Sequence, residues 1–205
     1  MTQENPRALA KRQQILSAAR QLFLQQGYAR TSTDAITEAA GISKQTLYAY
    51  YRGKAELLSA TIARELGGLD LDGRFHPPPT TLAELHTRLF EFAQAVTGQL
   101  LHPDALALLR LMLGEAVHVP ELRHALREAF PARLIGVTRH LLEDADAHGL
   151  IHAPDPELSA RMFVGPVMSY VALDGLFNSI LPLVPDASTL TRLVDLFLLP
   201  VRKEP

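Results

Sequence analysis

Apolar residues recur at spacings of three and four residues along most of the chain. This spacing places them on one stripe of an α-helix, as Ile15, Ala19 and Phe23 illustrate in the N-terminal part. In the C-terminal part the same pattern predicts helices over residues 82–101, 104–117, 120–148, 156–181 and 188–199. No pair of alternating segments indicates a β-hairpin. The pattern predicts an all-α fold of about nine helices.

Glycine and proline mark where these helices end or bend. Gly27 suits the left-handed position that closes the first helix. Pro131 should kink or split the helix over 120–148, because proline has no N–H to donate. Gly165-Pro166 predicts a bend in the following helix. Residues 67–80 hold three glycines and three consecutive prolines, which predicts a linker.

Two short helices with a tight connection lie near the N-terminus. Ser32 or Thr33 can cap the first of them, and Asp34 in its first turn favours the positive end of the helix dipole. Gly41 ends that helix, and Ser43 can cap the next one almost at once. So short a link between two short helices predicts a helix-turn-helix.

The second of these helices, residues 43–51, presents polar side chains outward. Leu47 and Tyr51 are four residues apart and share its buried face. The side chains left outside are those of Lys44, Gln45, Tyr48 and Tyr50. Lysine and glutamine can hydrogen-bond base edges in the major groove, and hydroxyls can hold phosphates. The alternative is that the tyrosines only cover the surface.

The charge is unevenly distributed along the chain. Residues 1–54 carry eight Lys and Arg against three acids, a net charge of +5, so the total of −2 leaves −7 for the remainder. A basic segment fits a polyanionic partner such as DNA, although a solvated basic helix face is the alternative. We therefore expect a DNA-binding domain over 1–54 and a helical regulatory and dimerisation domain over 55–205.

Composition excludes several other functions. The chain has no cysteine, which excludes disulfides, thiolate zinc sites and cysteine nucleophiles. His148 and His152 have a helical metal spacing, but Gly149 between them should break the helix. No catalytic motif, phosphate loop or membrane-length apolar run occurs, and the N-terminus lacks a signal peptide's apolar stretch. We expect no enzyme activity, cofactor or metal, and a cytoplasmic location.

The segment TSTDAITEAAGISKQTLYAYYRGKAELL closely resembles the N-terminal signature of the tetracycline-repressor (TetR) family. The resemblance extends from Ala8 to about Leu66. It implies a homodimer that binds a palindromic operator in double-stranded DNA and is released by a small molecule. Tyr51 departs from the family's usual phenylalanine, and Gly53 from its usual Ser or Asn cap.

The resemblance also assigns roles to residues by position. Lys44 and Gln45 match positions that reach bases, and Ser43 is the cap that can reach bases or backbone. The positions that match phosphate contacts are Thr33, Thr46, Tyr48, Tyr50 and Lys54.

The segment 158–181 is apolar nearly all round, with small residues interspersed. Together with residues 190–199 it predicts a hairpin through which two chains form a homodimer, so the interface is expected over about 158–199. The alternative is a helix buried inside its own monomer. The turn GLIHAPDPELSARMF before it resembles the same family less specifically.

A small hydrophobic or amphipathic effector is expected to bind between the helices of the C-terminal part. The candidates for lining its pocket are Phe92, Val96, Leu109, Met112, Leu113, Phe130, Leu134, Phe163, Val167 and Tyr170. For each of them, plain core packing is the alternative. A DNA-binding or architectural protein that takes no ligand also fits the sequence.

Overall fold

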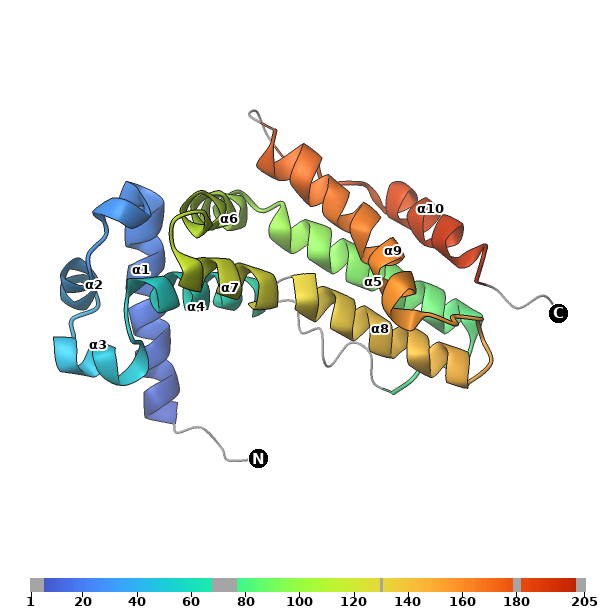
Figure 1. The fold of residues 1–205 in the computed structure, drawn as a ribbon, viewed down its shortest axis with the longest axis horizontal. Coiled ribbons are helices and arrows are strands. Elements are labelled where there is room, and N and C mark those ends of the chain that lie inside the picture. The colour runs from blue at the N-terminus through green and yellow to red at the C-terminus, as the bar shows by residue number, and fades with distance from the viewer. Residues whose placement is uncertain (1–5, 68–76, 130, 179–181, 202–205) are drawn as a thin grey trace. The chain divides into compact units, whose positions relative to one another are not determined.

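The fold is all-α within the described residues, as the apolar pattern predicts. The computed structural model describes residues 6–67, 77–129, 131–178 and 182–201. Within these ranges it holds ten α-helices, one π-helical segment and no β-strand (Figure 1). The linker prediction falls mainly on residues 68–76, which lie outside the described residues.

The helix ends follow the sequence signals closely. In chain order the elements are α1 (Pro6–Arg30), α2 (Thr33–Ala39), α3 (Lys44–Tyr50), α4 (Lys54–Gly67), α5 (Leu82–Leu100), α6 (Pro103–Ala116), α7 (Pro120–Ala129), α8 (Pro131–Ala147), α9 (Pro156–Ser169), η1 (Tyr170–Leu176) and α10 (Ala187–Leu198). The helix expected over 120–148 is split at Pro131 into α7 and α8. This split accounts for ten α-helices where about nine were expected.

The helices form two compact units. The head unit contains the described residues up to Glu65 together with Ala107–Ala129, and the body unit contains the remaining described residues. The head unit thus includes α7 and most of α6 besides the first four helices. The boundary expected after Lys54 divides the chain by function and not by packing, and it stays a prediction.

In the head unit, side-chain caps start both short helices. The Ser32 hydroxyl accepts a hydrogen bond from the Ala35 N–H at 3.1 Å, and the Ser43 hydroxyl accepts one from the Thr46 N–H at 3.1 Å. Leu47 is fully buried and Tyr51 is 7% exposed, as their spacing predicts. These contacts fix α2 and α3 in the predicted helix-turn-helix.

Gly27 makes a sharp break within α1. Its φ of 78° and ψ of 173° lie in a region that is almost restricted to glycine. The break lets Tyr28 fold back and stack on Phe23, with ring centroids 6.0 Å apart. The helical run predicted to end at Gly27 does end there in its backbone angles, although helical hydrogen bonding resumes as far as Arg30.

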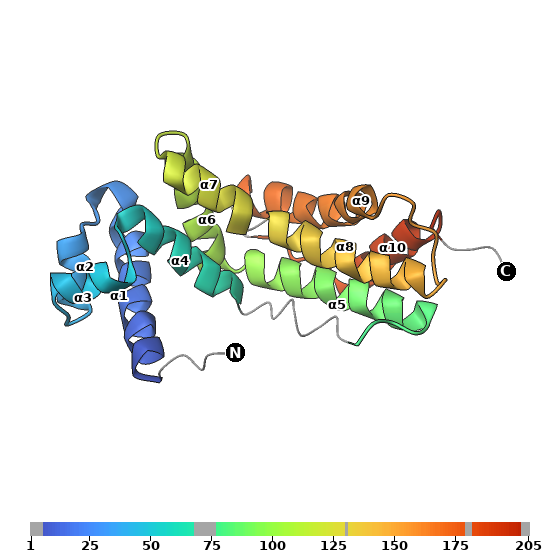
Figure 2. The same ribbon diagram turned by 60° about the horizontal axis from the view of Figure 1, so that its bottom comes forward.

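In the body unit, α9 packs against α5, α8 and α10 (Figure 2). Three phenylalanines meet where these helices come together. The Phe163 ring lies 5.9 Å from that of Phe92 on α5 and 5.0 Å from that of Phe197 on α10. One side of α9 therefore belongs to the core of its own unit.

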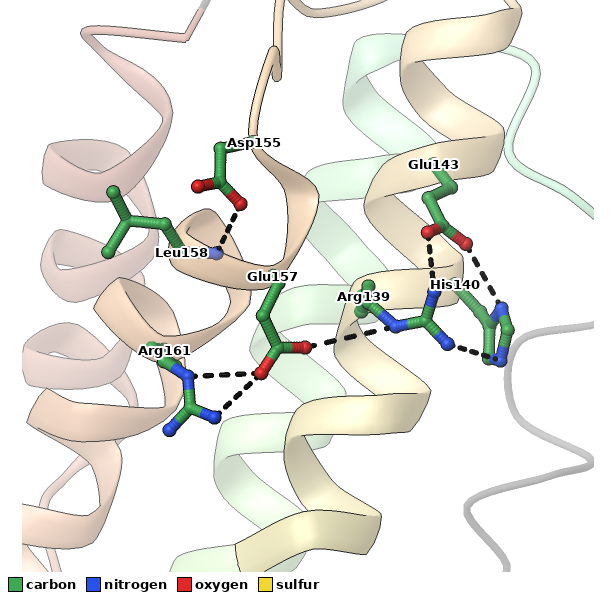
Figure 3. A network of polar contacts seen from close by, with 7 residues as sticks. All are labelled: Arg139, His140, Glu143, Asp155, Glu157, Leu158 and Arg161. Carbon is green, nitrogen blue, oxygen red and sulfur yellow. Dashed lines mark hydrogen bonds and ion pairs between the residues drawn. The ribbon is translucent and has the colours of Figure 1, made fainter.

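A polar network joins α8 to the start of α9 (Figure 3). Glu157 accepts hydrogen bonds from the Arg161 guanidinium, the shorter at 2.7 Å, and pairs with Arg139 on α8 at 3.9 Å. Arg139 also donates to Glu143 at 2.6 Å, and the Asp155 carboxylate caps α9 by accepting from the Leu158 N–H. Exposed pairs contribute roughly 0–1 kcal/mol each, so each of these pairs adds little to stability.

The helix expected to run to residue 181 changes type after α9. Residues Tyr170–Leu176 form a π-helix, and residues 179–181 lie outside the described residues. Gly175 is packed so closely that a Cβ there would lie 2.6 Å from a methyl carbon of Leu101. The bend expected at Gly165-Pro166 stays a prediction, since α9 continues through Pro166.

We expect Gly27→Ala to lower the free energy of unfolding by about 1–3 kcal/mol, because alanine disfavours the glycine-only backbone angles. Space is not the cause, since a Cβ at this position would lie 3.8 Å from its nearest neighbour, on Leu111. Urea denaturation measures the change. The matched control is Gly114→Ala, in a helical turn of the same unit with open space around it, which should stabilise by about 0.5 kcal/mol. A loss of equal size in both variants would contradict the backbone explanation.

Candidate nucleic-acid interface

The start of α3 carries most of the predicted DNA-contacting side chains, and they are accessible. Ser43, Lys44, Gln45 and Tyr48 are exposed. The other four predicted positions are half-buried, namely Thr33, Thr46, Tyr50 and Lys54. Because Leu47 anchors the opposite face of α3 in the core, the exposed side chains are held in a fixed direction.

Thr33 and Tyr48 come together across the two helices. Their hydroxyl oxygens lie 3.4 Å apart, and the Tyr48 side chain is 52% exposed. Thr33 is the first residue of α2, whereas Tyr48 lies in the middle of α3. Two hydroxyls this close, at the end of a helix that carries a partial positive charge, suit a single phosphate group.

Ser43 and Thr46 form a second hydroxyl pair at the N-terminus of α3. Their oxygens are 2.8 Å apart, and Ser43 also caps the helix through the Thr46 N–H. One of the two hydroxyl hydrogens is used between them, and the other can still donate to a phosphate.

Lys44 forms an ion pair with Asp34. For Asp34 the sequence indicates only a favourable interaction with the dipole of α2. The Lys44 Nζ lies 2.7 Å from the Asp34 Oδ1, and both side chains are 62% exposed. The hydrogen bond to Asp34, followed by the negative charge of Asp34, raises the pKa of Lys44. No spacing rule links residues ten apart across a turn, so local pattern could not reveal this pair.

Arg12 is a second residue that the sequence interpretation missed. Its guanidinium carbon lies 5.8 Å from the centre of the Tyr50 ring, and it reaches this ring from α1. In the sequence, the only signal for this role of Arg12 is the excess of basic residues over 1–54. The contact brings a cation to the half-buried Tyr50 at the C-terminal end of α3.

Lys54 has an internal role. Its ammonium donates to the Tyr28 carbonyl oxygen at 2.8 Å and to the Ala29 carbonyl oxygen at 3.4 Å, and it lies 4.2 Å from the centre of the Tyr28 ring. The phosphate contact expected from the resemblance stays a prediction, but it would compete with these bonds. Lys54 therefore joins the start of α4 to the end of α1.

Tyr28 forms one wall of an open hollow within the head unit. The hollow has a volume of about 960 Å³ and lies between the start of α4 and the start of α7. Burial raises the pKa of Tyr28, and the nearby charges of Glu115 and Glu121 raise it further. The Tyr28 hydroxyl thus loses its proton only at a higher pH than an ordinary tyrosine does.

The ten candidates for an effector pocket are divided between the two units. In the body unit, the fully or almost fully buried candidates are Phe92, Val96, Leu134, Phe163 and Val167, while Tyr170 is half-buried in the π-helix. Leu109 and Met112 are buried in the head unit, and Phe130 lies outside the described residues. Leu113 is 40% exposed, which is a poor position for lining an enclosed pocket. A pocket in the body stays a prediction.

Two further features of the described residues bear on other functions. No group of three His, Asp or Glu side chains in the described ranges could hold a metal ion. Among the described helices, none is long and apolar enough to cross a membrane.

Comparison with known protein families decides the affiliation. The model described as "Bacterial regulatory proteins, tetR family" matches residues 15–61, which include the helix-turn-helix. A second model, "AefR-like transcriptional repressor, C-terminal domain", matches residues 87–199, more than half of the chain. The chain belongs to the TetR family. As a TetR-family protein it is a sequence-specific DNA-binding transcriptional regulator, and the resemblance noted in its sequence is confirmed.

Individual TetR-family relatives agree. The transcriptional repressor SCO4008 of Streptomyces coelicolor is 31% identical over 76% of each chain. The regulator SrpR of Pseudomonas putida is 36% identical, but that match spans only 30% of this chain and 29% of the relative. Among solved structures, the flavonoid-responsive regulator FrrA superposes with a TM-score of 0.70 at 28% identity, over 96% of this chain and 99% of that one.

We expect Lys54→Met to lower the free energy of unfolding by about 1–2 kcal/mol, because it removes a charged donor from two carbonyl groups and a cation from the Tyr28 ring. Thermal denaturation without DNA measures this effect apart from any DNA contact. Lys44→Met is the matched control. That exposed side chain should change stability by less than about 0.5 kcal/mol. Equal stability of the two variants would refute the internal role of Lys54.

Proposed function

We propose that this protein is a homodimeric repressor that binds a palindromic operator and releases it when a small hydrophobic or amphipathic effector binds. The observation that carries the proposal is the exposed row Lys44, Gln45 and Tyr48 on α3, a helix whose other face is anchored by buried Leu47. Two such helices in one dimer would enter successive major grooves.

The proposed contacts fall into two classes. Lys44 and Gln45 reach base edges and determine the sequence, whereas the hydroxyls of Thr33 and Tyr48 bind phosphate and fix the position of the protein on DNA. Thr46, Tyr50 and Lys54 complete the phosphate-facing rim, with Arg12 as an added cation. Ser43 caps α3 and can reach bases or backbone. The net charge of +5 on residues 1–54 supports binding to a polyanion.

The dimer is proposed to form through α9, η1 and α10. Their inner residues, such as Phe163 and Val171, are buried in the body unit, so this part of the apolar segment packs within its own monomer. Other large apolar side chains on these elements or directly after them are more than half exposed, namely Leu158, Met162, Leu173, Phe177, Leu196 and Leu199. So many exposed apolar side chains on adjacent elements favour contact with a second copy.

The effector is the least defined part of the proposal. FrrA, which shares this fold at 28% identity, is described as flavonoid-responsive, and an amphipathic aromatic compound is therefore a reasonable first class to test. Buried aromatic and aliphatic side chains of the body unit, such as Phe92 and Phe163, would line its site. A DNA-binding protein without an effector would bind the same operator but would not release it.

We further propose that the protein acts in the cytoplasm and has no enzyme activity. The matched relatives are transcriptional regulators, and a regulator must reach the DNA that it controls.

The test begins with selection of bound sequences from a random DNA pool by the purified protein. We expect a palindromic site. On that site Gln45→Ala should lose about 1–3 kcal/mol of binding free energy at one base position in each half, because a bidentate amide contact discriminates between bases. Tyr48→Phe should weaken binding to operator and random DNA alike, because a phosphate contact carries no sequence information.

Fluorescence anisotropy on both duplexes separates these effects. Equal losses for Gln45→Ala on operator and random DNA would reassign Gln45 to the backbone. If no sequence were enriched at any of several salt concentrations, the proposed function would be refuted. Loss of binding upon addition of a flavonoid or another amphipathic compound would distinguish a ligand-responsive repressor from a ligand-independent DNA-binding protein.

We expect Leu173→Glu combined with Leu196→Glu to convert the dimer to a monomer, because two charges would be buried at the proposed interface. Light scattering after size exclusion measures the mass. Operator affinity should fall about a hundredfold through loss of bivalent binding. Val117→Glu, at an exposed apolar residue of the head unit, is the control and should remain dimeric. An unchanged mass in the double variant would place the interface elsewhere.

A further inference from the structure

A carboxylate lies among the side chains that face DNA in the proposed function. Asp34 is the second residue of α2 and reaches the Lys44 ammonium at 2.7 Å, next to exposed Gln45. Phosphates repel a carboxylate, so an acid in this position weakens binding to every DNA sequence. Its presence on α2, beside the start of α3, calls for a compensating role.

Helix capping does not account for the ion pair. Ser32 already caps α2 through the Ala35 N–H, and an acid in the first turn favours the helix dipole whichever way its side chain points. The Asp34 side chain instead meets Lys44 on the next helix. Glu38 provides a comparison. It is also exposed and lies one turn further along α2, but the ion pair of Lys44 is with Asp34.

Lysine is a flexible point charge that can follow any nearby phosphate. A free Lys44 would therefore add affinity for all DNA without adding discrimination. When it is paired with Asp34, its ammonium stays at the N-terminus of α3. There it can share the carboxylate and a base edge with strong acceptors, such as guanine O6 and N7, whereas a phosphate would bring a second anion towards Asp34.

We propose that Asp34 is a specificity-determining residue that acts by positioning Lys44, so that it weakens binding to non-operator DNA more than binding to the operator. The inference rests on the proposed DNA binding and deepens it. Lys44 contacts the base edge, and Asp34 limits the other contacts with DNA that the Lys44 ammonium can make.

The experiment compares the wild-type protein and Asp34→Asn on the selected operator and on a scrambled duplex of equal length and composition, over a range of salt concentrations. Asparagine keeps the shape of the side chain and removes its charge. We expect about two- to fivefold tighter binding to the scrambled duplex, the size of one surface charge interaction. The salt dependence on that duplex should steepen by about one phosphate contact. The ratio of operator to scrambled affinity should fall.

Glu38→Gln is the matched control, because it removes an exposed acid from the same helix. It should change binding to both duplexes by the same factor and leave the ratio unchanged. A second test introduces Asp34→Asn into a Lys44→Met background, where the ratio should no longer respond because the partner is absent. Thermal denaturation of each variant checks that it is folded.

The outcomes separate this inference from the proposed function. An operator that is selected normally, with a ratio that Asp34→Asn leaves unchanged, would overturn the role of Asp34 alone. A fall in the ratio that persists in the Lys44→Met background would also overturn it, because Asp34 would then act without Lys44. Failure of the wild-type protein to select any sequence would overturn the proposed function and this inference together.

Discussion

A helix of seven residues does not persist by itself in water, and α2 and α3 both have that length. Their stability comes from burial and capping. Leu47 and Ile36 are fully buried in the head unit, while Ser32 and Ser43 satisfy backbone N–H groups at the helix starts. Every proposed contact with DNA depends on this arrangement, because the same burial that holds α3 also orients its exposed side chains.

The elements of the fold were largely predictable, because local signals determine them. The hydroxyl caps at Ser32 and Ser43, the split at Pro131 and the buried pair Leu47 and Tyr51 each depend on residues only a few positions apart. The π-helix at Tyr170–Leu176 was not predictable in this way, since Gly175 is packed against Leu101, far away in the sequence. That contact cannot be read from the local periodicity.

The candidate site shows the same division between local and distant information. The exposure of Lys44, Gln45 and Tyr48 follows from the helical position of Leu47, and it is confirmed. What the spacing could not show is that the polar groups of this surface bond to one another. Lys44 meets Asp34, Thr33 meets Tyr48, and the Lys54 ammonium is directed at Tyr28. Binding to DNA would exchange these bonds for new ones, so its net gain is smaller than a count of contacts implies.

The head unit is built from two separate stretches of the chain, and this affects how the protein can evolve. The chain passes from one unit to the other at three places, after Glu65, after Leu106 and after Ala129. A single recombination event that joined this N-terminal segment to another member's C-terminal segment would leave α1–α4 without the α6 and α7 with which they are packed. Point mutation within α2 and α3 is then the simpler route to a new operator, because it leaves that packing intact.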